Sequence, residues 1–114
     1  MTVKYERIKK SIDFEKIFQT GKTITGRFVF LKTKKTKNRS CRLCFVVSSK
    51  VSKKAVERNK IKRRLREIIR SAYSELAQGY DIVIIAKKEI LSKNFTEIKE
   101  DITKTLKEAK IFSQ

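Results

Sequence analysis

One stretch of this chain, residues 82–86, is apolar without interruption and reads Ile-Val-Ile-Ile-Ala. A strand with one solvated face alternates apolar and polar residues, so an unbroken run indicates a strand buried on both faces, in the centre of a sheet or parallel to a neighbour. A parallel neighbour requires a crossover connection, usually a helix. The segment before the run has a helical pattern and supplies that crossover. We therefore expect a small sheet with at least one helix packed on it.

The helical segment extends from Ser52, a suitable N-cap, to about Ala77, and Gly79 ends it. Its apolar residues share a stripe about 100° wide, the width of a face that packs on a core. The opposite side is basic, because eight of the fourteen residues in 53–66 are Lys or Arg and one is acidic. The helix is expected to be buried on one side and strongly positive on the other. The apolar stripe contains Ile61, Leu65, Ile68, Ile69, Ala72 and Leu76.

The positive side of this helix is either solvated surface or a binding surface for a polyanion. A solvated face normally interleaves acidic residues at i to i+4 spacing, because like charges at that spacing repel. Here Glu67 is the single acid, so the unbalanced charge favours phosphate binding. The polar arc consists of Asn59, Lys60, Lys62, Arg63, Arg64, Arg66 and Arg70.

The whole chain has the same charge bias. Its 114 residues fit one domain, residues 1–114, and include 30 basic and 12 acidic residues, for a formal net charge of +18. This charge points to nucleic acid or an anionic membrane surface, and nucleic acid is favoured because no apolar run approaches the length of a membrane span. The first ten residues lack the apolar core of a signal peptide. We therefore expect a cytoplasmic protein with no membrane partner.

Cys41 and Cys44 form a lone Cys-x-x-Cys. A zinc site needs further ligands, and the chain has no His and no other Cys. A redox pair is also disfavoured, because the two residues lie in a predicted strand, where side chains three apart point to opposite faces. Buried, reduced cysteines are the favoured interpretation.

A short helix is expected near the start of the chain, from about Ser11 to Gly21. Its aromatic residues, Phe14 and Phe18, lie on one side at i and i+4. Core packing is the default interpretation of such a pair. The alternative is that the rings line the edge of a groove and stack on unpaired bases.

A β-hairpin is expected next. Residues 27–33 form a strand with Phe30 and Lys32 on one face, and residues 41–48 form the antiparallel return strand. The basic connector at residues 34–40 either protects a sheet edge with its lysines or reaches nucleic acid.

The last helix is expected to begin at Asn94, where Glu97 completes a capping-box pattern. The resulting order is helix, strand, strand, helix, strand, helix, and a further short strand near residues 21–27 fits the pattern. This order predicts an α+β sandwich in which helices cover a small mixed sheet. The apolar side of the last helix contains Phe95, Ile98, Ile102, Leu106 and Ala109.

Catalytic residues are not visible in the sequence. Hydrolysis of a phosphodiester by side chains needs carboxylates spaced to hold a divalent metal, or an acid and base of the His type. The chain has no His, its acids are scattered apart from the adjacent Glu100 and Asp101, and its three glycines form no phosphate loop. We expect no catalytic residue, no metal site and no small-molecule ligand, so a partner would have to supply any chemistry.

The basic helix resembles a family signature. Residues 54–63, Lys-Ala-Val-Glu-Arg-Asn-Lys-Ile-Lys-Arg, continue through residues 65–67 and closely resemble the signature of the bacterial ribonuclease P protein component. The resemblance covers nearly the whole chain. Further segments that agree in order and spacing are residues 13–14, Phe18, residues 21–22, Arg27, residues 47–50 and residues 79–84.

The resemblance implies the small subunit of a ribonucleoprotein endonuclease of tRNA processing. In that enzyme the RNA subunit performs Mg²⁺-dependent hydrolysis and removes the 5′ leader from precursor tRNA, which fits the missing protein active site. The implied partners are ribonuclease P RNA and precursor tRNA, with Mg²⁺ required by the RNA and no cofactor bound by the protein. The implied fold is a four-stranded mixed sheet with three helices and a left-handed βαβ crossover, an exception to the usual handedness.

In the family, the signature helix contacts the catalytic RNA, and the resemblance implies the same role for the matching residues of this helix. Arg58 differs from the other contacts, because on the helical wheel it lies toward the apolar side and is expected to point along the sheet rather than outward. The RNA-binding residues implied in this way are Lys53, Lys54, Arg58, Asn59, Lys60, Lys62, Arg63 and Arg66.

The resemblance also implies a cleft between the first helix and the sheet, in which aromatic rings hold the single-stranded leader. It shifts the interpretation of Phe14 and Phe18 from core to cleft, and adds Phe30 and Lys32 from the strand. Relatives often carry an aromatic residue where this chain has Lys32, so a phosphate contact replaces base stacking there. The loop at residues 51–54 lacks the glycine common in the family, which leaves its backbone path open.

Two other functions compete on charge alone. A plain RNA-binding protein, such as a small ribosomal component, would bind RNA without preferring substrates that carry a 5′ leader. A DNA-binding module would need the basic helix to enter a major groove, which is less compatible with a helix anchored across a sheet.

Overall fold

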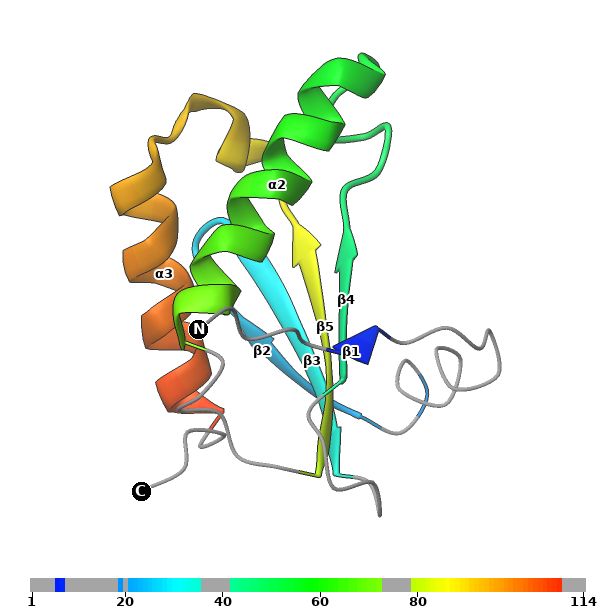
Figure 1. Ribbon diagram of the computed structural model, residues 1–114, viewed down its shortest axis with the longest axis vertical. Coiled ribbons are helices and arrows are strands. Elements are labelled where there is room, and N and C mark those ends of the chain that lie inside the picture. Colours follow the sequence, from blue (N-terminus) through cyan, green and yellow to red (C-terminus); the bar gives the residue numbers. More distant parts are fainter. Residues whose placement is uncertain (1–5, 8–18, 20, 36–41, 73–78, 110–114) are drawn as a thin grey trace.

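The computed structural model describes residues 6–7, 19, 21–35, 42–72 and 79–109. Within them, two α-helices lie on one face of a twisted sheet (Figure 1). The elements in chain order are β1 (Glu6–Arg7), β2 (Lys22–Thr25), β3 (Val29–Lys35), β4 (Arg42–Val46), α2 (Ala55–Ala72), β5 (Tyr80–Ala86), the 3₁₀ helix η2 (Lys88–Ser92) and α3 (Phe95–Glu108).

The central strand of the sheet is β5. The strand order is β1-β4-β5-β3-β2, in which β5 pairs parallel with β4 and antiparallel with β3. Ile82, Val83 and Ile84 are each 0% exposed, which confirms the prediction from the apolar run. The α+β class with a mixed sheet is therefore confirmed. Strands β2 to β5 make up the predicted four, and the two-residue β1 adds a fifth at the edge beside β4.

The predicted hairpin between residues 27–33 and 41–48 is wrong. β3 and β4 are not neighbours, because β5 lies between them and pairs with both. Closeness in sequence favours a hairpin, but the apolar run of β5 is buried most fully in the centre of the sheet. β3 instead forms its antiparallel pair with β2, which fulfils the expectation of a short strand near residues 21–27.

The core lies between the helices and one face of the sheet. Residues paired across neighbouring strands point to the same face, so Leu31 and its partner Ile84 both face the helices. Buried residues at helical spacing on α2 and α3 complete this layer, as most of their apolar stripes predict. The prediction is wrong at Phe95, which begins α3 and is 36% exposed, and Ala109 is only partly buried. The core residues of the helices are Ile61, Leu65, Ile68, Ile69, Ile98, Ile102 and Leu106.

The helix ends differ in how well they match the sequence signals. Asn94 caps α3 as predicted, because its side chain accepts the Glu97 N–H at 2.9 Å. The cap predicted at Ser52 is wrong, since α2 begins later, at Ala55. Gly79 has a φ of 85°, a left-handed conformation that favours glycine, directly before β5. Apart from Gln19 and its predicted end at Gly21, the predicted first helix lies outside the described residues, as do residues 73–77 of the predicted basic helix.

Candidate nucleic-acid interface

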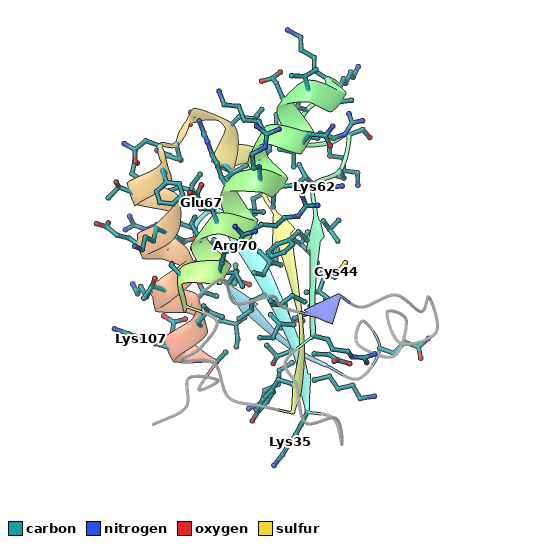
Figure 2. All side chains as sticks on the ribbon, in the orientation of Figure 1. Lys35, Cys44, Lys62, Glu67, Arg70 and Lys107 are labelled. Carbon is teal, nitrogen blue, oxygen red and sulfur yellow. The ribbon has the colours of Figure 1, made fainter. Side chains whose placement is uncertain are left out.

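α2 is held by its apolar side and presents its basic side to solvent. Ile61, Leu65, Ile68 and Ile69 are at most 5% exposed against the sheet. Figure 2 shows nitrogen-tipped side chains, among them Lys62 and Arg70, extending outward along the length of α2. The charged surface therefore rests on a rigid, buried row of aliphatic side chains.

All eight predicted RNA-binding residues belong to α2 or to the two residues before it, and none is fully buried. Three of them are half-buried, Arg58, Lys62 and Arg66. We call the eight residues the α2 basic surface. Its exposed members are Lys53, Lys54, Asn59, Lys60 and Arg63.

The loop before α2 is held by side chains rather than by a glycine. Val51 is 4% exposed, and its N–H donates to the Ser48 carbonyl at 3.0 Å, which closes a turn. Ser52 lies between the loop and the helix, because its hydroxyl accepts the Lys54 N–H at 3.2 Å and donates to Glu57 at 3.1 Å. The backbone path left open by the missing glycine is thus a turn anchored in the core.

Arg58 points back toward this loop. Its guanidinium donates to the Ser52 carbonyl at 3.0 Å, so it does not extend straight outward from the helix. This agrees with its expected position toward the apolar side of the wheel. The contact joins the loop that carries Lys53 and Lys54 to the body of α2, and Arg58 as a whole is half-buried.

Arg66 combines a half-buried side chain with an unsatisfied donor. Among the described residues, its Nε is buried and has no hydrogen-bond partner. A buried donor without an acceptor costs about 1–3 kcal/mol. A phosphate oxygen is a strong acceptor for guanidinium groups, so an anionic partner that drew the Arg66 side chain outward would satisfy this donor.

The sheet face away from α2 and α3 carries Phe30 and Lys32. Both residues lie on the same face of β3, as predicted. Phe30 lies opposite Ile85 and Lys32 lies opposite Val83 of β5. Phe30 is 37% exposed and Lys32 is half-buried. The other two predicted leader-binding residues, Phe14 and Phe18, lie outside the described residues, so their place beside this face stays a prediction.

Lys87 is a candidate residue that sequence reasoning missed. Its Nζ lies 4.5 Å from the centroid of the Phe30 ring, a cation–π distance. A signal was present in the sequence: Lys87 follows β5 directly and has the same strand parity as Ile85, the partner of Phe30. β5 was predicted as a central or parallel strand, but its pairing with β3 did not follow from the sequence, because residues 27–33 were expected to pair with residues 41–48.

A buried ion pair lies at the other end of the same sheet face. Asp81 of β5 accepts two bonds from the Arg42 guanidinium, at 2.8 Å from Nε and 2.6 Å from Nη2. The Asp81 side chain is 3% exposed and that of Arg42 is 18% exposed. Both groups satisfy each other, so they hold β4 against β5 rather than offering a charge to a ligand.

Cys44 lies on the same face, opposite Val83, as a free and half-buried thiol. Burial raises its pKa, and the positive charge of Lys62 lowers it by a smaller amount. Cys41 and residues 36–40 of the basic connector lie outside the described residues, so the reduced state of the cysteine pair and the role of the connector stay predictions. The first two residues of the connector, Lys34 and Lys35, belong to the end of β3.

No metal-ligating cluster of three or more His, Cys, Asp or Glu side chains occurs among the residues that the structure describes. In the same part of the chain, no helix has both the length and the hydropathy needed to cross a bilayer.

Comparison with known proteins identifies the family. The family model described as ribonuclease P matches residues 3–110. A ribonuclease P protein component from Caldanaerobacter subterraneus subsp. tengcongensis is 34% identical over 114 residues, which cover 100% of this chain and 97% of that protein. One from Streptococcus pneumoniae serotype 4 is 38% identical over 112 residues, which cover 95% of this chain and 87% of that protein.

Solved structures share the fold. The RNase P protein of Staphylococcus aureus matches with a TM-score of 0.87 at 34% identity, over 96% of this chain and 100% of that chain. The RNase P protein from Thermotoga maritima matches with a TM-score of 0.82 at 33% identity, over 90% and 96% of the two chains. With its α2 basic surface and a family match over most of its length, this chain belongs to the ribonuclease P protein family, the protein components of the ribonucleoprotein endoribonuclease that acts in tRNA processing.

Proposed function

We propose that the α2 basic surface binds the RNA subunit of ribonuclease P, and that the sheet face with Phe30 and Lys32 binds the single-stranded 5′ leader of precursor tRNA. The observation that carries the proposal is the construction of α2. Its buried row holds the helix on the sheet, so the backbone positions from which the cations extend are fixed relative to one another. A fixed row of attachment points keeps the cations concentrated on one side of the helix, where they can contact several phosphates of a folded RNA.

The leader is proposed to contact the opposite sheet face. Phe30 offers an exposed ring on which an unpaired base can stack, a contact worth about 1–3 kcal/mol. Lys32, two residues further along β3, places a cation on the same face for the leader phosphates. Phe14 and Phe18 are proposed to complete the cleft from the first helix.

We assign hydrolysis to the RNA subunit and its Mg²⁺. The two buried carboxylates among the described residues are already engaged: Asp81 accepts from Arg42, and Asp101 accepts two backbone N–H groups. Both carboxylates are therefore satisfied by donors of the protein itself, and we propose that neither holds a catalytic Mg²⁺. The protein positions the two RNAs, and we propose that it does so in the cytoplasm, where bacterial precursor tRNA is made.

Reconstitution with a bacterial ribonuclease P RNA tests the proposal. At low Mg²⁺, adding the protein should increase cleavage of precursor tRNA and tighten its binding relative to mature tRNA. Phe30→Ala should lower affinity for leader-bearing substrate by roughly tenfold and leave mature tRNA unchanged. An equal loss for both substrates would contradict leader binding at this face.

The RNA-subunit contact needs its own control. Replacing Arg63 and Arg66 with Ala should weaken binding to the RNA subunit and flatten its dependence on salt, by about 0.7–0.9 units of log–log slope for each lost phosphate contact. Replacing Lys99 and Lys107, exposed on α3, removes the same charge elsewhere. If both pairs reduce the slope equally, the α2 basic surface has no special role.

We also propose the finer features of the family fold, a first helix and a left-handed β4-α2-β5 crossover. The crossover is supported by Figure 1, in which β4 and β5 point the same way, α2 lies in front of the sheet, and the chain passes from β4 on the right to β5 on its left. In a right-handed crossover seen with the helix toward the viewer and the strands pointing up, the chain would pass from the first strand to a second strand on its right.

A further inference from the structure

The turn between β2 and β3 is clamped by one buried carboxylate of α3. Asp101 is 7% exposed, and its two carboxylate oxygens accept the N–H groups of Arg27 and Phe28, each at 2.8 Å. Hydrogen bonds to a charged acceptor are about twice as strong as neutral ones. This pair fixes the orientation of two successive peptide groups, so the turn at residues 26–28 has little freedom to move away from α3.

Gly26 lets the turn sit this close to α3. A Cβ at this position would lie 2.6 Å from the Thr105 hydroxyl oxygen and 2.9 Å from an Asp101 carboxylate oxygen, closer than such atoms approach. The Gly26 N–H also donates to the Val29 carbonyl at 2.8 Å, which closes the turn. With its neighbours fixed on both sides, the Gly26 carbonyl has a defined direction.

That carbonyl holds the cation beside Phe30. The Lys87 ammonium donates to the Gly26 carbonyl at 2.7 Å and lies 4.5 Å from the Phe30 ring centroid. The Lys87 backbone N–H donates to the Phe28 carbonyl at 2.9 Å, so the residue is held at two points. A free lysine has several rotatable bonds and many positions, whereas this one has an anchored head.

We propose that Asp101 is a positioning residue of the leader-binding face: by clamping the turn at residues 26–28 it directs the Gly26 carbonyl, which holds the Lys87 ammonium beside the Phe30 ring. The inference rests on the proposed function of that face. With the ammonium on one side of the ring, a base stacks on the part of Phe30 left open, and the ammonium meets the phosphate of the same nucleotide. Asp101 touches no RNA and acts through the turn.

The role differs from general stabilisation of the fold. A carboxylate that only supports α3 would change binding of every RNA ligand alike when removed. A carboxylate that sets the position of Lys87 changes the preference for leader-bearing substrate and leaves the contact of the α2 basic surface with the RNA subunit intact, because α2 shares no hydrogen bond with the turn among the described contacts.

The test uses the reconstituted holoenzyme. Asp101→Asn keeps the side-chain volume but removes the charge and one acceptor, so it should reduce affinity for leader-bearing precursor tRNA by roughly threefold to tenfold and leave affinity for mature tRNA and for the RNA subunit unchanged. Thr105→Ala is the matched control, since its hydroxyl lies beside Gly26 but donates to the Asp101 backbone carbonyl, so the substitution removes no hydrogen bond to the turn. Ile102→Val removes a methyl group from the core on the same helix and no hydrogen bond to the turn, so it reports the effect of lower stability alone.

Lys87→Met tests the same link from the surface end and keeps the experiment decisive if Asp101→Asn folds poorly. It should cause a comparable loss for leader-bearing substrate, and Asp101→Asn should add little in the Lys87→Met background. Fully additive losses, or an equal loss for mature tRNA, would overturn the positioning role. If Phe30→Ala itself leaves leader preference unchanged, the proposed function of the face fails instead, which separates the two outcomes.

Discussion

Arg66 allows the sharpest test of the α2 basic surface, because its side chain carries a cost in the free protein, a buried donor without an acceptor. Its Nε is buried without a hydrogen-bond partner, whereas Arg63, one turn away on the same helix, is exposed. Arg66→Met keeps the apolar stem that packs beside the core and removes the unsatisfied donor. Arg63→Met removes an equal charge without removing a buried donor, so it is the matched control.

The magnitude follows from the burial of that one donor. An unsatisfied buried polar group costs about 1–3 kcal/mol, and since Arg66 as a whole is only half-buried we expect Arg66→Met to raise the free energy of unfolding by about 1 kcal/mol. For a domain of this size that is a rise of about 3–5 °C in Tm. Arg63→Met should leave Tm unchanged. Both variants should reduce the salt dependence of binding to the RNA subunit by about 0.7–0.9 slope units.

Thermal unfolding of the free protein and salt titrations of RNA binding measure the two quantities separately. We expect Arg66→Met to raise the stability of the protein and lower its affinity for RNA, and Arg63→Met to lower the affinity alone. If Arg66→Met melts below the parent chain, the Nε is satisfied in solution and the argument from the buried donor is wrong. If its salt slope equals that of the parent, Arg66 makes no phosphate contact.

Other perturbations test the fold and the remaining groups. Arg42→Met should lower the free energy of unfolding by about 3–5 kcal/mol, because it leaves the buried Asp81 carboxylate without its partner, and urea unfolding will measure this. Gly26→Ala should destabilise by about 1–3 kcal/mol through its contact with the Thr105 hydroxyl, and Thr105→Ala in the same chain should recover part of that loss. Burial raises the pKa of Cys44 above the ordinary 9.0, so the neutral thiol persists to higher pH in the folded state. Alkylation followed by peptide mass analysis should therefore show a half-maximal rate above pH 9. A half-maximal rate at the pH found for an unfolded peptide would contradict the burial of this thiol.

Much of the fold could be predicted because the signals were local. The apolar run of β5 required burial on both faces, and the spacing of Ile61, Leu65 and Ile68 fixed which side of α2 faces the sheet. Asn94 caps α3 by a contact three residues away. Each of these follows from residues close in sequence, where period and capping chemistry are sufficient.

Strand order could not be predicted in the same way. Residues 27–33 and 41–48 have the composition of a hairpin, and nothing local shows that a strand about 40 residues later lies between them. The same limit applies to the candidate site. The charges of α2 were visible in the sequence, but the meeting of Lys87 with Phe30 depends on β5 lying beside β3. The clamp on the turn depends further on a carboxylate of α3, 73 or more residues away from its partners.

The central place of β5 also determines when the sheet can form during synthesis. β4 has a strand partner on one side in the two-residue β1, and its main partner is translated only after the whole of α2. A nascent chain that ends before residue 80 therefore holds β2 and β3 as a pair and leaves β4 almost unpaired, whatever the length of its helix. Emergence of β5 from the ribosome is therefore the event that can join the two parts of the sheet, after roughly two thirds of the chain, and the core is complete only when α3 follows.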